Sequence, residues 1–87
     1  MKNLGRIGRL FRHATYDEYG KFLGYLGNFD IQFENGRTFG MLTPKHKFDV
    51  LIGGVWEPTV IRYDGSKDWY YLEGIGDIFE LGQIVRI

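Results

Sequence analysis

The sequence contains no cysteine and only two prolines among its 87 residues. Without cysteine the chain has no disulfide scaffold, thiolate zinc site or thiol nucleophile. No apolar run approaches the ~18 residues that a membrane span needs, and no apolar signal segment follows the basic N-terminus. We therefore expect a soluble, cytoplasmic protein that does not bind membranes. Its length allows one domain, which covers residues 1–87.

A net charge is also missing, because 11 Lys and Arg residues balance 11 Asp and Glu residues. The charges are segregated, however: residues 1–13 contain Lys2, Arg6, Arg9 and Arg12 without an acid, and all 11 acids follow. The basic segment either contacts a phosphate backbone or an acidic partner, or forms the solvent face of a first strand. A pI of about 6.7 disfavours a dedicated nucleic-acid binder, whose domain pI usually exceeds ~9.

Glycine and aromatic residues are abundant instead, with 13 Gly, 7 Phe, 6 Tyr and 2 Trp. Glycines interrupt the chain at short intervals, and β-branched and aromatic residues lie between them, which is typical of short strands. No window keeps a helical apolar stripe free of glycine. The sequence predicts an all-β domain of 7–8 short strands, either a strongly bent SH3-like barrel or a compact two-sheet sandwich. Gly24, Gly40 and Gly74 lie where a barrel would bend, which favours the barrel.

Individual strands follow from alternation of apolar and polar residues. In the first strand Ile7 and Phe11 are expected to face inward, and at residues 28–34 the inward side chains are Phe29, Ile31 and Phe33. Strands are expected at residues 6–13, 21–27, 28–34, 37–42, 48–52, 55–63, 68–73 and 83–87.

Turn residues separate these strands. Asn35-Gly36 and Gly53-Gly54 favour tight hairpin turns in which both residues have positive φ. Pro58 marks an edge position or a bulge, because proline cannot donate to a ladder. Turns or loops are also expected at residues 15–20, 43–47 and 64–67, with a short helical turn at 77–81.

Three motifs follow one another in the second half and together form a pattern: a Trp-x-Pro-Thr-x-Ile-x-Tyr strand, a Trp-Tyr-Leu strand and a closing Gly-x-x-Val-Arg-Ile. The positions are Trp56, Pro58, Thr59, Ile61, Tyr63, Trp69, Tyr70 or Tyr71, Leu72, Gly82, Val85, Arg86 and Ile87. In this pattern the chain resembles a family of small bacterial and mobile-element proteins of unknown function. Residues 8–10 and 19–20 match more loosely.

The resemblance implies a compact β domain in a setting of plasmids, phages or their hosts, and it implies no reaction. Relatives often carry a cysteine-containing segment before the strand that begins here at Phe48. This chain has Lys45, His46 and Lys47 in that place, which leaves a metal or thiol role without support.

The sequence offers little catalytic chemistry. His13 and His46 are the only histidines, and their basic neighbours disfavour a divalent cation. Ser66 is the only serine and lacks a nucleophile elbow. We therefore expect a protein that is not an enzyme and that binds no metal or cofactor. A cleft would be needed to make use of the carboxylates in the second half, Asp64, Asp68, Glu73, Asp77 and Glu80.

Surplus aromatic residues are the remaining lead, because six tyrosines exceed what so small a core can hold. Side chains alternate along residues 69–72, so at least one aromatic there points outward. Exposed tyrosines beside arginines are typical of protein interfaces, the same pairing stacks nucleobases, and cross-strand aromatic pairs can simply stabilise a thin sheet. The expected partner-binding residues are Arg6, Arg9, Arg12, Tyr16, Tyr19, Lys45, Lys47 and Tyr70.

These observations predict a non-enzymatic binding module that occupies the surface of a partner protein. The mobile-element resemblance implies a phage or plasmid inhibitor of a host defence system, of the anti-CRISPR type. The alternative is a small β-barrel that binds nucleic acid or a nucleotide through the basic strand and Tyr70. The chain is expected to be a monomer or a homodimer, the latter because a last strand at residues 83–87 would expose an edge guarded only by Arg86.

Overall fold

The structure is a computed structural model that describes residues 5–78 and 82–87, with the side chains at 26–28 and 77 excepted. Within these residues the chain forms eight β-strands and no helix. The strands are β1 (Ile7–Tyr16), β2 (Phe22–Phe33), β3 (Phe48–Ile52), β4 (Val55–Thr59), β5 (Ile61–Asp64), β6 (Trp69–Leu72), β7 (Gly76–Asp77) and β8 (Ile84–Arg86).

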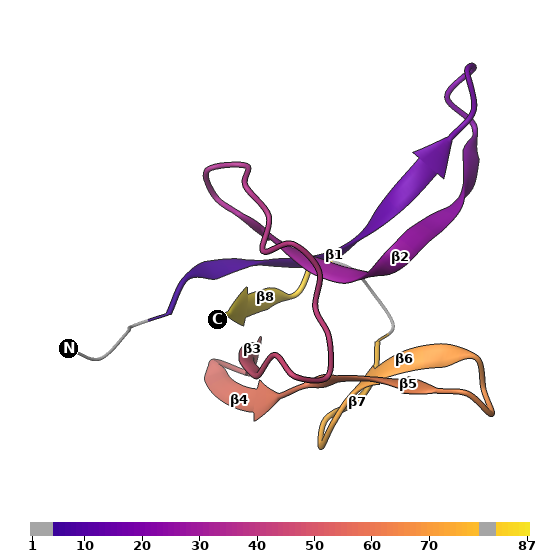
Figure 1. Ribbon diagram of the computed structural model, residues 1–87. Helices are drawn as coiled ribbons and strands as arrows, with labels where there is room; N and C mark the ends of the chain where they lie inside the picture. Colours follow the sequence, from indigo (N-terminus) through magenta and orange to yellow (C-terminus); the bar gives the residue numbers. More distant parts are fainter. Residues whose placement is uncertain (1–4, 79–81) are drawn as a thin grey trace.

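The strands form two antiparallel sheets (Figure 1). The larger sheet has the order β2-β1-β8-β3-β4, and the smaller has the order β5-β6-β7. The all-β class, the number of strands and the two-sheet arrangement are therefore confirmed. The barrel that the glycines favoured does not form, because the described edge strands β2 and β4 of the larger sheet are not paired with each other. At Val60 the chain passes from one sheet to the other, which divides the strand expected at residues 55–63.

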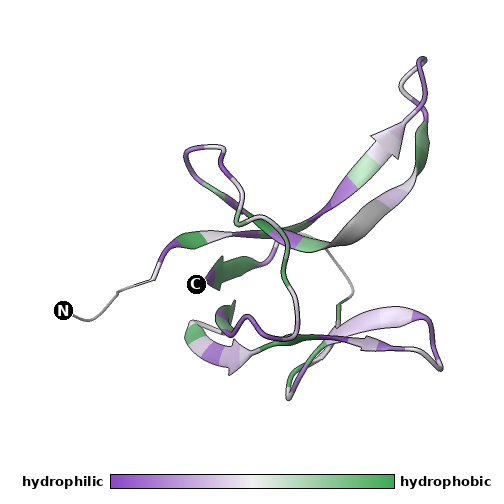
Figure 2. Cartoon of the chain, viewed as in Figure 1, coloured by the Kyte–Doolittle hydropathy of each residue, from purple (hydrophilic) through white to green (hydrophobic). Residues whose placement is uncertain are grey.

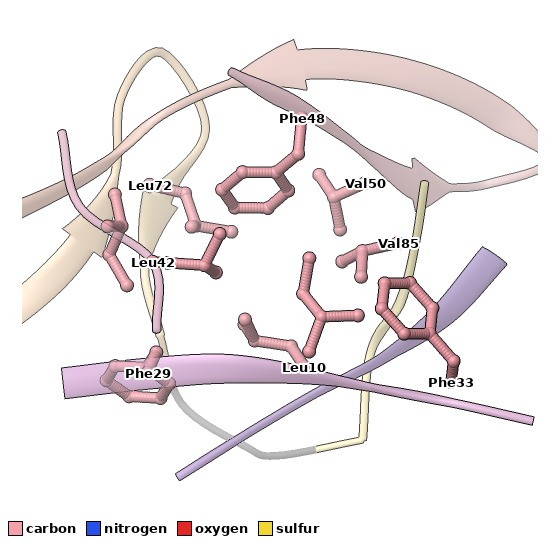
Figure 3. Close-up of a cluster of buried hydrophobic side chains, with 10 residues drawn as sticks. Leu10, Phe29, Phe33, Leu42, Phe48, Val50, Leu72 and Val85 are labelled. Atoms are coloured by element: carbon pink, nitrogen blue, oxygen red, sulfur yellow. The ribbon is translucent and has the colours of Figure 1, made fainter. Parts of the chain in front are cut away.

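Side chains from both sheets meet in one hydrophobic core (Figure 3). Each full burial of such a side chain stabilises the fold by about 1.5–3 kcal/mol. Figure 2 shows apolar and polar residues interspersed along the strands, as expected where one face of a sheet is covered. The core cluster consists of Leu10, Phe29, Ile31, Phe33, Leu42, Phe48, Val50, Ile61, Leu72 and Val85.

The inward faces of the first two strands are only partly as expected. Phe29, Ile31 and Phe33 are all buried, which confirms their alternation. The expectation for Ile7 was wrong, because its side chain is 58% exposed. Gly8 and Leu10 face the core in its place, since Gly8 pairs with Phe33 on β2 in the register that the buried β2 residues set.

Residues 21–34 form one long strand rather than the two expected strands. β2 runs without interruption past Gly24 and pairs with β1, which continues to Tyr16. Register shifts occur between Arg12 and Ala14 and between Thr15 and Tyr16 of β1. The chain accommodates the glycine-containing stretch by bulging rather than by ending the strand.

The turn between β1 and β2 begins after Tyr16 and is shorter than expected. Asp17 Oδ1 accepts hydrogen bonds from the N–H groups of Tyr19 and Lys21, both at 2.8 Å. Gly20 has a φ of 84°, the left-handed conformation that glycine adopts most readily. The roles predicted for Asp17 and Gly20 in this turn are therefore correct, although residues 15 and 16 belong to β1.

The turn at Asn35-Gly36 is confirmed in position, but it is of a different type. Only Gly36 has a positive φ, of 84°, and its N–H donates to the Phe33 carbonyl at 2.9 Å. Phe33 N–H in turn donates to the Arg37 carbonyl at 2.8 Å. This is the pattern of a three-residue hairpin loop with glycine in the left-handed position rather than of a two-residue type I′ turn.

The expected strand at residues 37–42 is wrong, because this segment makes only one isolated bridge to β2. Gly40 and Met41 have φ values of 116° and 119°, which interrupt an extended strand. The Gly40 N–H donates to the Asp30 side chain at 3.0 Å instead of to a ladder partner. The segment nevertheless covers the base of β2, since Leu42 N–H donates to the Phe29 carbonyl at 2.8 Å.

In the second half, the β3–β4 turn and the edge position of Pro58 agree with the sequence prediction. Gly53 and Gly54 have φ values of 58° and 82°, so both central residues of the β3–β4 turn are left-handed, as a type I′ turn requires. Pro58 lies on β4, an edge strand, as expected. The last strand, β8, lies between β1 and β3, so the exposed C-terminal edge that suggested a homodimer does not exist. The helical turn expected at residues 77–81 falls largely outside the described residues.

Candidate functional site

The outer half of the β1–β2 hairpin projects beyond the rest of the larger sheet (Figure 1). β8 pairs only with Ile7–Arg9 of β1. On the other side, the segment at residues 37–42 makes its last backbone hydrogen bond to β2 at Phe29. Beyond these points the hairpin continues to Tyr16 and Phe22 as a two-stranded ribbon. A ribbon of two strands is marginally stable on its own, so its side chains need contacts elsewhere.

Aromatic rings occupy one face of this ribbon. Tyr16 lies opposite Phe22 in the register, and their ring centroids are 5.9 Å apart in an edge-to-face arrangement. Phe22 and Tyr25 form a second edge-to-face pair at 5.2 Å. The three residues are 61%, 49% and 51% exposed, respectively. The rings therefore contact one another while leaving about half of their surface open to solvent.

Arg12 connects the ribbon to the smaller sheet. Its guanidinium carbon lies 5.1 Å from the Tyr25 ring centroid, 5.2 Å from that of Phe29 and 5.0 Å from that of Tyr70. Tyr70 belongs to β6 and contacts Phe29 edge-to-face at 5.4 Å. Each cation–π contact contributes about 0.5–1 kcal/mol at exposed sites. One arginine thus holds aromatic residues from both sheets together.

Tyr63 of β5 extends the contacts by one more ring, since its centroid lies 5.1 Å from that of Tyr70. Its hydroxyl donates to Asp68 Oδ1, and this bond raises the pKa of the Tyr63 hydroxyl above its usual value. We call the continuous surface formed by these side chains the aromatic–arginine row. It consists of Tyr16, Phe22, Tyr25, Arg12, Tyr70 and Tyr63.

Asp30 fixes the base of the ribbon on the opposite face. It is 1% exposed, and its carboxylate accepts the N–H groups of Ile31 at 2.7 Å and Gly40 at 3.0 Å, while His13 Nε2 lies 3.0 Å from its other oxygen. Burial raises the pKa of this carboxyl, but the hydrogen bonds from His13 and from the backbone outweigh it and hold the pKa below its usual value. The charged form of Asp30 therefore joins β1, β2 and residues 37–42.

Three of the residues expected at the site lie in the aromatic–arginine row: Arg12, Tyr16 and Tyr70. Tyr19 lies beside the row in the turn of the hairpin and is 88% exposed. Trp69 is 44% exposed while its neighbours Tyr70 and Tyr71 are half-buried, which confirms that one aromatic of that strand points outward.

The other expected residues are dispersed. The Arg6 guanidinium lies over the Phe33 ring at 4.2 Å, at the far end of β1 from the ribbon. Arg9 donates to the Gly82 carbonyl at 3.1 Å and lines an open hollow of about 610 Å³. Lys45 and Lys47 are exposed in the loop before β3. The basic residues of the first strand therefore do not form one patch, because Arg9 points to the opposite face from Arg12, and Arg6 and Arg12 lie at opposite ends of the segment.

Phe22, Tyr25 and Tyr63 were not expected at the site. The first two were missed because a separate strand at residues 21–27 gave no register against β1. Reading residues 22–33 as one regular strand would have placed Tyr25 opposite Tyr16, because only the two register shifts bring Phe22 opposite Tyr16 and Tyr25 opposite Ala14. Tyr63 joins the row through Tyr70, its partner on β6, and no signal in the sequence alone predicts that Tyr70 meets Arg12, because that contact crosses between the two sheets.

His46 and Ser66, the residues considered for metal binding and nucleophilic catalysis, are both held by local hydrogen bonds. His46 is held in its own loop, where its Nδ1 accepts the Thr43 N–H at 3.0 Å. Ser66 donates to Asp64 in the β5–β6 turn, and this bond is the main reason that the pKa of the Asp64 carboxyl is lowered. Within the described residues, no three His, Cys, Asp or Glu side chains are grouped as a metal site would need. The described part of the chain has no helix that is long and apolar enough to cross a membrane.

Fold and site together define a small all-β domain with two antiparallel sheets and an aromatic surface that crosses between them. Residues 21–87 match the model of a family described as a domain of unknown function, DUF5348, and the chain belongs to that family. This agrees with the expected resemblance to a small uncharacterised family, while the looser matches at residues 8–10 and 19–20 lie outside the matched range. No curated protein and no solved structure matches the chain.

Proposed function

We propose that this chain is a non-enzymatic binding module that acts by occupying the surface of a partner protein through its aromatic–arginine row. The observation that carries the proposal is the exposure of Tyr16, Phe22 and Tyr25 on a ribbon that projects from the core. Isolated exposed apolar side chains are ordinary, but a continuous row of them marks an interaction surface.

The chemistry of the row favours a protein as the partner. Tyrosine and arginine are enriched among the residues that dominate binding energy at protein interfaces, because they desolvate well and lose little conformational freedom. The edge-to-face contacts and the Arg12 stack hold the rings in place before binding, which lowers the entropy cost of association. Tyr19, at the hairpin turn, extends the same surface.

The setting implied by the family resemblance extends this proposal. A module of 87 residues that blocks a surface without catalysis has the properties of an inhibitor carried by a phage or plasmid. We place the partner among host defence proteins on that resemblance alone. A plasmid-borne copy should then raise the plating efficiency of a restricted phage, and a copy with Tyr16→Ser and Phe22→Ser should not.

Nucleic-acid or nucleotide binding is the second candidate, because aromatic rings and an arginine can also stack bases. The acids Asp64 and Asp68 beside Tyr63, and the absence of one basic patch on β1, favour the protein partner over this candidate. Salt distinguishes the two, since phosphate contacts weaken steeply with rising salt and a largely apolar interface does not.

The experiment is capture from a lysate of the native host at low and high salt, with and without nuclease. Wild-type chain should retain a specific protein at both salt concentrations, and Tyr16→Ser with Phe22→Ser should lose it. Ile7→Ser is the matched control, because Ile7 is 58% exposed on the same strand but outside the row. Retention of nucleic acid, lost at high salt, would support the second candidate, and equal capture by both variants would refute the row as the binding surface.

A further inference from the structure

The outer half of β2 is an unguarded sheet edge. β2 is the last strand of the larger sheet, and within the described chain residues 22–28 have no partner on the side away from β1. The segment that covers the base of β2 reaches only to Phe29. Backbone N–H and C=O groups on such an edge are free to pair with another strand.

The other edges carry the residues that prevent such pairing, and this one does not. β4 has Glu57 and Pro58, β5 has Arg62, and the open stretch of β1 has Arg12 and His13. Residues 22–27, by contrast, read Phe-Leu-Gly-Tyr-Leu-Gly, with no charge and no proline. Proteins usually blunt exposed edges with charges, proline or bulges; this stretch has the bulges described above but neither a charge nor a proline, which leaves it a candidate pairing surface.

We propose that this edge pairs with the same edge of a second copy of the chain, so that two β1–β2 ribbons join as a four-stranded antiparallel sheet. A two-fold axis beside β2 places the identical segments of the two copies antiparallel to each other. An uncharged stretch tolerates this pairing, because no like charges are brought together. Joining the ribbons also gives each one the additional strands that a two-stranded hairpin lacks.

Charge complementarity favours a second copy over an unrelated strand. In the antiparallel arrangement the hairpin turn of one copy runs beside the base of β2 in the other copy. The turn at residues 17–21 carries Asp17, Glu18 and Lys21 and is negative by one charge, whereas residues 37–47, which cover the base and continue to β3, carry Arg37, Lys45 and Lys47 and no acid. Opposite charges therefore approach at both ends of the pairing, where they fix its register.

The pairing leaves the aromatic–arginine row available. Strands join edge to edge, so the face that bears Tyr16, Phe22 and Tyr25 remains on one side of the joined sheet, and the two rows become neighbours. The dimer and the partner surface are separate features, and the proposal of a dimer stands or falls without the proposed function.

The test is the mass of the full chain by light scattering over a concentration series. Wild type should show the mass of two chains, and Leu23→Lys should raise the dissociation constant at least about tenfold, because both copies gain a charge and lose apolar contact within the paired segment. Leu23 is 63% exposed, so the fold should tolerate the change. Val55→Lys is the control on the other edge strand, where the side chain is 55% exposed.

Charge reversal supplies an independent arm. Glu18→Lys should weaken the dimer, and adding Lys45→Glu to it should restore binding. Amides at residues 22–28 should also lose protection from hydrogen exchange when wild type is diluted. A wild-type mass of one chain throughout the series would overturn the proposal, as would a Leu23→Lys variant, folded by circular dichroism, that dimerises like wild type.

Discussion

Gly8 has the closest neighbours of the described glycines. It pairs with Phe33 on β2 and with Val85 on β8. A Cβ at this position would lie 2.6 Å from the Gln32 carbonyl oxygen and 2.6 Å from Ile31 Cγ2. Its φ lies outside the left-handed region, so glycine is required by close approach of neighbouring strands and not by backbone conformation.

Replacing Gly8 by alanine should therefore lower the free energy of unfolding by about 1–3 kcal/mol, the usual cost of overpacking. Chemical denaturation followed by circular dichroism measures this change. Gly65→Ala is the matched control, because the nearest side-chain atom would lie at an ordinary 3.9 Å. Equal stability of the Gly8→Ala variant and the wild type would contradict the tight packing of β1 between β2 and β8.

Asp30 makes the stability of the fold depend on pH. The pKa of its carboxyl is lower in the folded chain than in the unfolded one, where it is about 3.9. The charged form therefore stabilises the fold above that pH, and the stabilisation is lost as the pH falls through the lower folded value.

Asp30→Asn should accordingly destabilise the chain by about 1–3 kcal/mol at neutral pH, because it removes the charge and replaces the oxygen beside His13 Nε2 by an NH2 group, although one oxygen still accepts the Ile31 and Gly40 N–H groups. The difference from wild type should shrink as the pH falls below about 4. Thermal unfolding of both proteins across a pH series tests this, with Glu57→Gln on the exposed face of β4 as a neutral control. A difference that stays constant with pH would show that the charge of Asp30 has no role.

At the scale of the elements, the ribbon depends on the Arg12 stack. A planar, weakly hydrated guanidinium stacks on aromatic faces such as the three rings around Arg12, whereas a lysine ammonium is a strongly hydrated point charge that does not stack. Arg12→Lys should therefore lower the free energy of unfolding by about 1–2 kcal/mol, from the loss of two or three cation–π contacts. Hydrogen exchange at the ribbon amides should accelerate more than exchange at the core strands.

Arg37→Lys serves as the control for this substitution, because Arg37 is exposed in the hairpin turn after β2. Chemical denaturation and hydrogen exchange of the wild type and of both lysine variants test the role of Arg12. If both lysine variants behaved alike, the contacts of Arg12 with the two sheets would not contribute to the stability of the ribbon.

Local patterns predicted most of the strands, and the failures have physical causes. Alternation placed Phe29, Ile31 and Phe33 correctly because one covered face selects every second residue. The division of β2 failed because a boundary was set between residues 27 and 28, whereas β1 pairs with residues on both sides of it and keeps them in one bulged strand. The strand predicted at residues 37–42 does not form, because the Asp30 side chain takes the place of a ladder partner for Gly40.

The candidate site was less predictable than the strands, for a reason that belongs to the whole molecule. Charge along the chain suggested one basic patch, but Arg6 and Arg12 lie far apart, over Phe33 and Tyr70 respectively, and Arg9 points to the other face of β1. Contacts such as that between Arg12 and Tyr70 join two sheets. No local pattern encodes them, because they depend on how the sheets pack.

The molecule is elongated, with extents of 47 × 35 × 24 Å and a radius of gyration of 13.8 Å. A compact chain of this length has a radius of gyration of about 12 Å. The projecting ribbon accounts for the excess, as Figure 1 shows. A shape of this kind presents the aromatic–arginine row away from the core, where a partner can reach both the ribbon and the smaller sheet.

Site-specific photo-crosslinking in the native host tests the row as a partner surface most directly. A photoreactive phenylalanine at Tyr16 and another at Tyr63 should each yield the same protein adduct, because the row spans both sheets. The same probe at Ile7 or Val55, which are equally exposed but lie outside the row, should yield none. Adducts at Ile7 and Val55 but not at Tyr16 and Tyr63, or adducts with nucleic acid alone, would contradict the account.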